Sequence, residues 1–215
     1  MSKEKVPTKE KIIAKALELY NTHGIEYAGV RELAKELNMK GGNITYYFPT
    51  KNDLIRELTH RLSEVNAALF SREKEISIYN FLDMHRAIYA NQYRYRALII
   101  SLPLLLKQDQ EFARTYAERQ VSRKKAIYQE LKSLFLAGYF QTAKAQDMDT
   151  ILHAITITNR FWISEATVDE TIEDGEAAIN TYLQRLAGLL HIIASDKGKE
   201  DIRKFLEDLS NKKAG

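Results

Sequence analysis

The 215-residue chain contains no cysteine, which excludes a disulfide scaffold and thiolate chemistry and fits a reducing cytoplasm. Its longest apolar run, residues 97–106, is interrupted by Ser101 and Pro103 and is far shorter than the ~20 residues that span a bilayer. The N-terminal stretch MSKEKVPTKEK lacks the apolar segment of a secretory signal. We therefore expect a cytoplasmic protein with no membrane partner.

The chain also has little net charge and no pattern typical of strands or repeats. The net charge of +3 permits nucleic-acid binding without indicating it unaided, and the hydrophobic content of 45% is ample for a buried core. No strand-like alternation bounded by hairpin dipeptides, no internal repeat and no low-complexity tract is found. These absences predict an all-α protein, which at this length is either one large domain or a small domain joined to a larger one.

Helical apolar spacing runs through nearly the whole chain. Thr8 is a plausible N-cap for the first helix and Gly24 a natural stop, and Thr50 can cap a helix that begins near Lys51. Pro103 should kink or end the helix that contains it. The expected helices cover residues 8–23, two short segments within 30–48, then 53–72, 75–92, 94–107, 109–138, 148–167, 175–195 and 199–211.

Residues 30–51, VRELAKELNMKGGNITYYFPTK, are the most informative segment. Their apolar positions Val30, Leu33, Ala34 and Leu37 follow the i, i+3, i+4, i+7 spacing of a short helix with one buried face. Asn38 and Met39 interrupt this pattern, and a second short helix opens at Gly41-Gly42 with Ile44 and Phe48 as its apolar anchors. Two short helices joined by a tight turn are typical of a helix-turn-helix.

Residues 8–60 resemble the N-terminal domain of the TetR family of bacterial transcriptional regulators. The family pattern is matched at Ala16, Gly24, Val30, Arg31, Glu32, Leu33, Ala34, Gly42, Asn43, Ile44, Tyr46, Tyr47, Phe48, Lys51 and Leu54. The chain departs at Ala28-Gly29, where the family usually has a capping hydroxyl, and at Lys40-Gly41, where a positive charge has moved by one residue. The resemblance implies a three-helix helix-turn-helix domain over residues 1–52, then a helical effector-binding and dimerisation domain over residues 53–215.

Candidate DNA contacts follow from these positions. Lys40 and Lys51 flank the second short helix and can reach phosphates, while Arg31 can hold a phosphate or pair with a guanine. Asn43 and Thr45 are the expected base readers. The other predicted contacts are the backbone at Gly41 and Gly42 and the rings of Tyr46 and Tyr47. The alternatives are that Arg31 and Lys51 are solvated charges and that Tyr46 packs on the small core.

The larger domain carries polar side chains on faces that are otherwise apolar. They are His85 and Gln92 in 75–92, Gln120 and Arg123 in 109–138, and Asn159 beside Trp162 in 148–167. Polar groups on buried faces are costly unless they are paired. Two interpretations stay open: these groups pair with one another, or they line a cavity for a small, largely apolar or aromatic effector.

The resemblance also implies a homodimer on a palindromic operator, usually as a repressor. Broad apolar faces near the C-terminus, with Ile179, Leu183, Leu186, Leu190 and Ile193, favour dimerisation through 148–167 and 175–195. The alternative is a helical DNA-binding regulator controlled by a protein partner, with a filled core. We expect no enzyme activity, cofactor or metal. The single E-x-x-H at Glu57 and His60 lacks the second pair that helical di-iron sites need.

Overall fold

The computed structural model describes residues 7–71, 74–141 and 145–211. Within these ranges it contains helices and one isolated antiparallel bridge, between Phe140 and Ala194, but no strand. The helices are α1 Thr8–His23, α2 Val30–Glu36, α3 Gly41–Tyr47, α4 Lys51–Phe70, α5 Ile78–Arg94, α6 Arg96–Ile100, α7 Leu102–Gln108, α8 Gln110–Leu136, α9 Ala145–Val168, α10 Gly175–His191 and α11 Asp196–Asn211. The predicted all-α class is confirmed. Residues 1–6, which hold most of the polar N-terminal stretch, and Arg72, the expected end of the fourth helix, lie outside the described residues.

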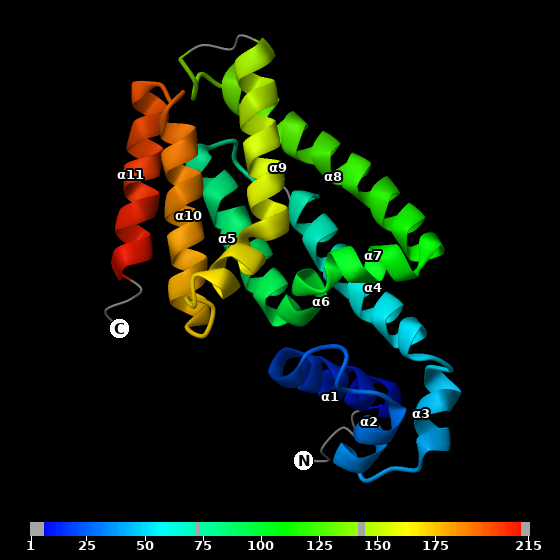
Figure 1. Ribbon diagram of the computed structural model, residues 1–215. Coiled ribbons are helices and arrows are strands. Elements are labelled where there is room, and N and C mark those ends of the chain that lie inside the picture. Colours follow the sequence, from blue (N-terminus) through cyan, green and yellow to red (C-terminus); the bar gives the residue numbers. More distant parts are fainter. Residues whose placement is uncertain (1–6, 72–73, 142–144, 212–215) are drawn as a thin grey trace, which may run out of the picture.

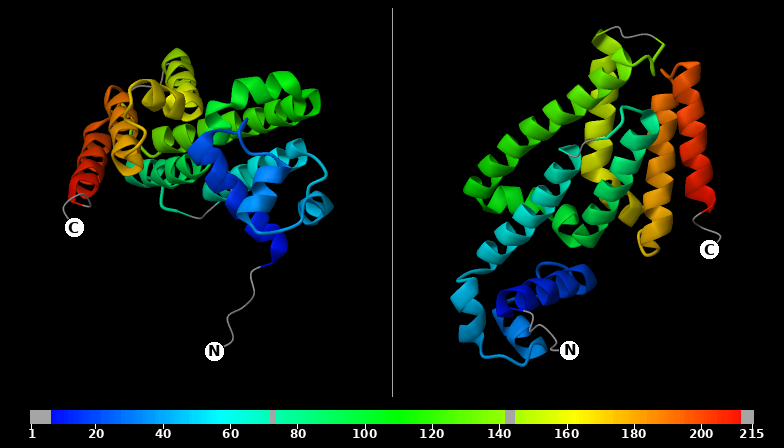
Figure 2. Two further views of the ribbon diagram at one scale, coloured as in Figure 1. Left: turned by 60° about the horizontal axis from the view of Figure 1, so that its bottom comes forward. Right: turned by 180° about the vertical axis from the view of Figure 1, so that it is seen from behind.

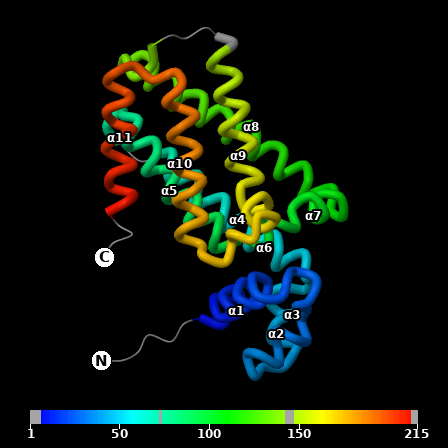
Figure 3. The backbone as a smooth tube through the Cα atoms, turned by 60° about the vertical axis from the view of Figure 1, so that its left-hand side comes forward, coloured from blue at the N-terminus to red at the C-terminus, as the bar shows by residue number. Residues whose placement is uncertain are grey.

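Helices α1–α3 form a small bundle at one end of the molecule, and α5 with α8–α11 form a larger bundle at the other (Figure 1). Helix α4 runs from the small bundle into the large one, where it contacts α5 and α8 (Figure 2). Helix α10 lies between α9 and α11 and packs on α5 (Figure 3). At about 1.5 Å per residue, the 20 residues of α4 span roughly 30 Å.

Two clusters of buried apolar residues correspond to the two bundles. The first is centred on residues such as Ile12, Leu33 and Ile44, and it also takes in Leu98 and Phe112 from the neighbouring α6 and α8. The second contains the large rings in the centre of the larger bundle, among them Phe81, Tyr89, Trp162 and Tyr182. Helix α4 contributes Leu54 and Leu58 to the first cluster and Leu69 to the second, so the predicted domain boundary at residues 52 and 53 falls in its first turn.

Local sequence signals account for most helix ends. Thr50 caps α4, because its Oγ1 accepts from the Asp53 amide at 3.2 Å while the Asp53 carboxylate accepts from the Thr50 amide at 2.9 Å. The expected helix over 94–107 is divided at Ser101, and Pro103 stands in the first turn of α7, where its missing N–H costs nothing. Thr8 is not the N-cap of α1: it is the first helical residue, Pro7 precedes it, and no side-chain cap bond forms.

The apolar residues expected to form a dimer face on 175–195 are largely in the core instead. Leu183, Leu186 and Leu190 are each at most 1% exposed and belong to the second cluster. Ile179 and Ile193 are half-buried against the same cluster. Helix α10 is covered by α5, α9 and α11, which satisfies this apolar face within one subunit. Sequence periodicity identified the face correctly but could not say which helices cover it.

Candidate functional site

Helices α2 and α3 are joined by the tight turn that the sequence indicated. Asn38 has a φ of 50° in this turn, and the Met39 amide donates to the Ala34 carbonyl at 2.8 Å. Asn tolerates this left-handed conformation better than most residues do. At the start of α2 the Glu32 carboxylate accepts from the Gly29 amide at 3.0 Å, and hydrogen bonds from backbone amides lower the pKa of Glu32. The turn and the helix start are therefore fixed by local bonds.

Helix α3 is held by two anchors and is otherwise open to solvent. Ile44 is 0% and Phe48 is 4% exposed within the first cluster. By contrast, Tyr46 is 80% and Tyr47 39% exposed, and their rings meet edge to face with centroids 5.0 Å apart. The possibility that Tyr46 packs on the core is therefore wrong. The side chains of the predicted base readers Asn43 and Thr45 are exposed as well.

The two glycines that open α3 have no steric role within the subunit. A Cβ at Gly42 would meet no atom within 4 Å, and one at Gly41 would only touch Val30 Cγ1 at 3.8 Å. Neither has a positive φ. Because glycine disfavours a helix relative to alanine, the fold gains nothing from these two residues. They leave the backbone bare at the start of an exposed helix.

Three cations surround this exposed surface. Arg31 lies in the first turn of α2, Lys40 immediately precedes α3, and Lys51 is the first residue of α4. Among the described residues no carboxylate lies within 4.0 Å of the charged nitrogens of any of them. Arg31 and Lys51 are close enough to Glu32 to help lower the pKa of its carboxyl. All nine predicted DNA contacts thus lie on α2, on α3 or directly before it, or at the first residue of α4, within residues 31–51.

In the larger bundle, four of the six predicted ligand contacts form hydrogen bonds with one another. The Trp162 indole N–H donates to Gln92 Oε1 at 2.6 Å, and Gln92 Nε2 donates to the Asn159 carbonyl at 2.8 Å. The Asn159 side-chain oxygen accepts from the Tyr89 hydroxyl at 2.8 Å, and its Nδ2 lies 3.3 Å from His85 Nε2. We call these five residues the core polar network.

The geometry of the core polar network requires a neutral His85. Its Nδ1 lies 2.9 Å from the Phe81 carbonyl oxygen, which can only accept, so the proton is on Nδ1 and Nε2 accepts from the Asn159 amide. Burial lowers the pKa of His85 from 6.5 to about 4. Within this network the polar groups pair with one another, the first of the two interpretations offered by the sequence.

Two adjacent hollows lie beside the network. The inner cavity, of about 40 Å³, is bordered by Thr59, Leu62, Ser63, Asn66, Gln92, Leu98, Ile99, Leu102, Tyr116, Arg123, Asn159 and Arg160. The α4–α8 groove, of about 390 Å³, is bordered by Ser63, Glu64, Asn66, Ala67, Phe70, Ser71, Glu118, Arg119, Ser122, Arg123 and Ala126. Ser63, Asn66 and Arg123 border both, so the groove and the cavity share part of their walls. A groove of this volume is within the range of small-molecule sites.

The remaining predicted ligand residues, Gln120 and Arg123, lie on the inner face of α8 near these hollows. Burial lowers the pKa of Arg123, and the positive charges of Arg160 and Arg119 add to that effect. Arg160, on α9, is a residue that sequence reasoning missed. It stands beside Asn159 at the edge of the apolar stripe, where periodicity does not separate an inward side chain from an outward one.

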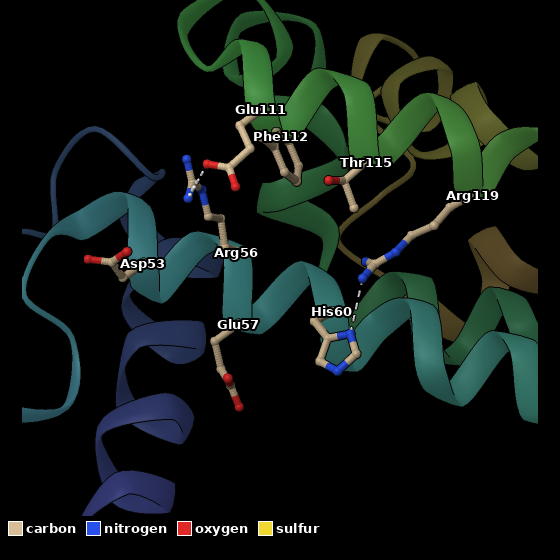
Figure 4. A pocket seen from close by; sticks show the side chains of 8 residues that line it. All are labelled: Asp53, Arg56, Glu57, His60, Glu111, Phe112, Thr115 and Arg119. Atoms are coloured by element: carbon tan, nitrogen blue, oxygen red, sulfur yellow. Dashed lines mark hydrogen bonds and ion pairs between the residues drawn. The ribbon is translucent and has the colours of Figure 1, made fainter.

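A charged pocket connects the first half of α4 with the start of α8 (Figure 4). Arg56 Nη2 lies 2.7 Å from an Asp109 oxygen, and Arg56 Nη1 lies 2.9 Å from a Glu111 oxygen. One turn further along α4, His60 Nδ1 lies 3.1 Å from Arg119 Nη2. These contacts tie the helix that leaves the small bundle to the wall of the α4–α8 groove.

Comparison with known proteins agrees with this arrangement. A family model described as "Bacterial regulatory proteins, tetR family" matches residues 12–58, and one described as "TetR: Bacterial transcriptional repressor" matches residues 61–202. The chain belongs to the TetR family, which consists of transcriptional regulators rather than enzymes. It is accordingly a DNA-binding transcriptional regulator, and its helix-turn-helix is the DNA-binding element.

Individual relatives extend the likeness to the whole fold. The "Probable HTH-type transcriptional regulator YttP" of Bacillus subtilis (strain 168) is 40% identical over 60 residues, which cover 28% of this chain and only 29% of that protein. A TetR-family regulator from Marinobacter aquaeolei VT8 superimposes with a TM-score of 0.83 at 19% identity, over 95% of this chain and 99% of that one. A gamma-butyrolactone receptor (ArpA-like protein) gives 0.70 at 11% identity, over 95% and 97%. At these identities the structures establish a common fold alone.

Two further observations concern the described ranges only. No helix there has the length and apolar character needed to cross a membrane. No group of three or more His, Asp or Glu side chains in those ranges is arranged to hold a metal ion.

Proposed function

We propose that this protein is a dimeric repressor that binds a palindromic operator through α2 and α3 and is released by a small-molecule effector. The observation that carries the DNA half of this proposal is the surface of α3. Ile44 and the adjoining Phe48 are buried, while the polar and aromatic side chains of α3 are exposed beside cations that have no carboxylate partner among the described residues. A short helix with this division of roles is suited to a major groove.

The proposed contacts divide into positioning and sequence reading. Lys40 and Lys51 hold phosphates on either side of α3, and the free amides at the start of α4 add to the second of these contacts. Asn43 and Thr45 read base edges, and Arg31 holds a phosphate or pairs with a guanine. The bare backbone at Gly41-Gly42 allows the helix to approach the DNA closely.

For the dimer we propose the outer faces of α9 and α10. On α9, Ile157 is 44% and Phe161 43% exposed, one helical turn apart on the same face. Arg185 of α10 lies 3.2 Å from Glu165 of α9 and joins the two faces. Two copies related by a two-fold axis would place two α3 helices in successive major grooves, about 34–36 Å apart or somewhat more.

For the effector we propose the α4–α8 groove. Helix α4 begins at the DNA-binding surface and borders this groove at its other end, so a ligand between α4 and α8 can favour one tilt of α4. Only one tilt would set the two α3 helices at the right separation. The ion pairs of Arg56 with Asp109 and Glu111 hold α4 in one position relative to the start of α8, and such a ligand would alter that position. A typical coupling of ~1–3 kcal/mol would change operator affinity by about 5–150-fold.

A regulator controlled by a protein partner is the second candidate. It is favoured by the core polar network, which fills the centre of the larger bundle with satisfied hydrogen bonds. The two candidates differ in one measurement. If an effector controls the protein, that effector displaces an apolar dye bound to it. If a protein partner controls it, no small molecule displaces the dye.

The operator half is tested by selection from a library of random-sequence duplex DNA. We expect enrichment of an inverted repeat and a complex with an even number of chains. Sedimentation should give a dimer at micromolar concentration, and the double variant Ile157→Glu, Phe161→Glu should be a monomer. A monomeric wild-type protein, or enrichment of no common sequence, would contradict the proposal.

A further inference from the structure

The α4–α8 groove and the inner cavity are both bordered by Arg123, whose charge has no carboxylate partner in the part of the chain that the structure describes. Seven arginines are half-buried in the described residues. Arg56, Arg61 and Arg86 each have a carboxylate oxygen within 3.0 Å. Arg96 and Arg119 donate to a carbonyl and to an imidazole. The remaining two, Arg123 and Arg160, have no carboxylate within 4.0 Å among the described residues.

The two unbalanced arginines face the same space. Arg123 and Arg160 both border the inner cavity, together with Tyr116. They are close enough to each other for the charge of Arg160 to lower the pKa of Arg123, and both counteract the increase that burial causes in the pKa of Tyr116. Two guanidinium groups that face one cavity without an anion are unfavourable, because neither charge is neutralised.

The two helices that carry these arginines also carry buried hydrogen-bond donors without acceptors. Arg160 Nε is buried and has no hydrogen-bond partner among the described residues, and the same is true of Gln120 Nε2, one turn from Arg123 on α8. All of these groups are N–H donors. A carboxylate, sulfonate or phosphate supplies several acceptor sites and a negative charge, so it would accept from Arg160 Nε and neutralise the two arginines together.

The α4–α8 groove, which Arg123 also borders, is apolar along much of its wall. Ala67 and Phe70 of α4 and Ala126 of α8 lie along it, and the acidic side chains that border it, Glu64 and Glu118, are exposed. Glu64 lies 3.7 Å from His60 Nδ1, and neither Glu64 nor Glu118 forms an ion pair with Arg123. This arrangement suits a ligand with an acidic group at the inner end and an apolar body in the groove.

We infer that the α4–α8 groove binds an amphipathic organic anion, with its acidic group against Arg123 and Arg160 and its apolar body between α4 and α8. This inference rests on the proposed effector function and specifies the chemical class of the effector. The effector should therefore carry a negatively charged group. A neutral apolar compound of the same size would lack the contact with the two arginines.

The test uses two dyes of the same aromatic skeleton, 1-anilinonaphthalene-8-sulfonate and its uncharged counterpart N-phenyl-1-naphthylamine. Fluorescence titrations of the full chain should show that Arg123→Gln lowers the affinity for the sulfonate about tenfold and changes that for the neutral dye by less than about twofold. Arg123→Lys, which keeps the charge, should retain most of the sulfonate affinity. Arg160→Gln should act in the same direction as Arg123→Gln and provides the comparison if Arg123→Gln does not fold.

The matched control is Arg203→Gln, which removes the same charge from α11, where Arg203 pairs with Glu200 and Glu207. It should change neither affinity. Equal effects of Arg123→Gln on both dyes, no effect on either, a response to Arg203→Gln, or no sulfonate binding by the wild-type protein would each overturn the inference. The dye titrations contain no DNA, so their outcome does not bear on the operator proposal. A failure to bind an operator would likewise not change the interpretation of the dye titrations.

Discussion

Polar side chains are exposed at one end of the molecule and buried in hydrogen bonds at the other. On α2 and α3 the amide, hydroxyl, aromatic and cationic groups are exposed, so they contribute little to packing. In the larger bundle the core polar network is buried, and its members hydrogen bond with one another. A substitution at the first end should therefore affect binding, and one at the second end should affect stability.

The largest expected contrast is between two aromatic residues. Trp162→Ala removes a side chain that is 1% exposed and leaves Gln92 Oε1 without its donor, so the free energy of unfolding should fall by about 3–5 kcal/mol. Tyr46→Ala, at a side chain that is 80% exposed, should change it by less than about 0.5 kcal/mol but weaken operator binding. Denaturant titrations and operator titrations of both variants measure this contrast. A Tyr46→Ala variant that is as destabilised as Trp162→Ala would contradict it.

The core polar network should also make stability depend on pH. The pKa of His85 is about 4 in the folded chain and 6.5 ordinarily, so the unfolded chain binds the extra proton first. The contribution is complete above pH 6.5 and is lost as the pH falls towards 4, by about 3 kcal/mol at most. Denaturant titrations across this window should show a flatter pH dependence for His85→Gln than for the wild-type protein. Identical slopes would show that His85 is not the group responsible.

At the DNA-binding end, the expected effects are on sequence preference. Asn43→Ala and Thr45→Ala should each relax the preference at particular operator positions, with mismatch costs reduced by roughly 1–3 kcal/mol, because these side chains are proposed to read base edges. Stability should change little, since both are exposed. The measurement is a set of titrations against single-base variants of the selected operator. An unchanged preference profile in both variants would remove these two residues from the list of base readers.

The smallest expected effect belongs to a phosphate contact. Lys51→Ala should weaken binding to every sequence alike and reduce the slope of log affinity against log salt by about one. Lys204→Ala, on α11, removes the same charge far from the small bundle and should leave that slope unchanged. If Lys51→Ala altered sequence preference instead, the division between positioning and reading residues would be wrong.

The same contrast explains how much could be predicted from the sequence. The helix-turn-helix is local: its stripe, its turn at Asn38 and its cap at Thr50 lie within about twenty residues of one another, so a single-chain pattern specifies them. The buried anchors Ile44 and Phe48 and the helix that begins at Lys51 were predicted for this reason. The exposure of Tyr46 was left open, because a tyrosine at this spacing suits either a core or a surface.

The larger bundle joins residues that are far apart in the chain. His85 and Asn159 are 74 residues apart, and whether they pair with each other or with a ligand depends on how α5 and α9 pack. Periodicity also marked Leu183, Leu186 and Leu190 as an apolar face, but α11 and α5 supply the cover that had been expected from a second subunit. Arg160 was missed because its neighbour Asn159 occupies the centre of the same stripe.

Gly42→Ala tests the central claim most directly, because the fold and the proposed DNA contact make opposite demands at this residue. A Cβ at Gly42 would meet no atom within 4 Å, and alanine favours a helix, so the melting temperature should equal or exceed that of the wild-type protein. On the operator the same methyl group would stand between α3 and the DNA, so affinity in a fluorescence anisotropy titration should fall at least about tenfold. A stable Gly42→Ala protein that binds the operator as tightly as the wild type would contradict the assignment of this surface to DNA.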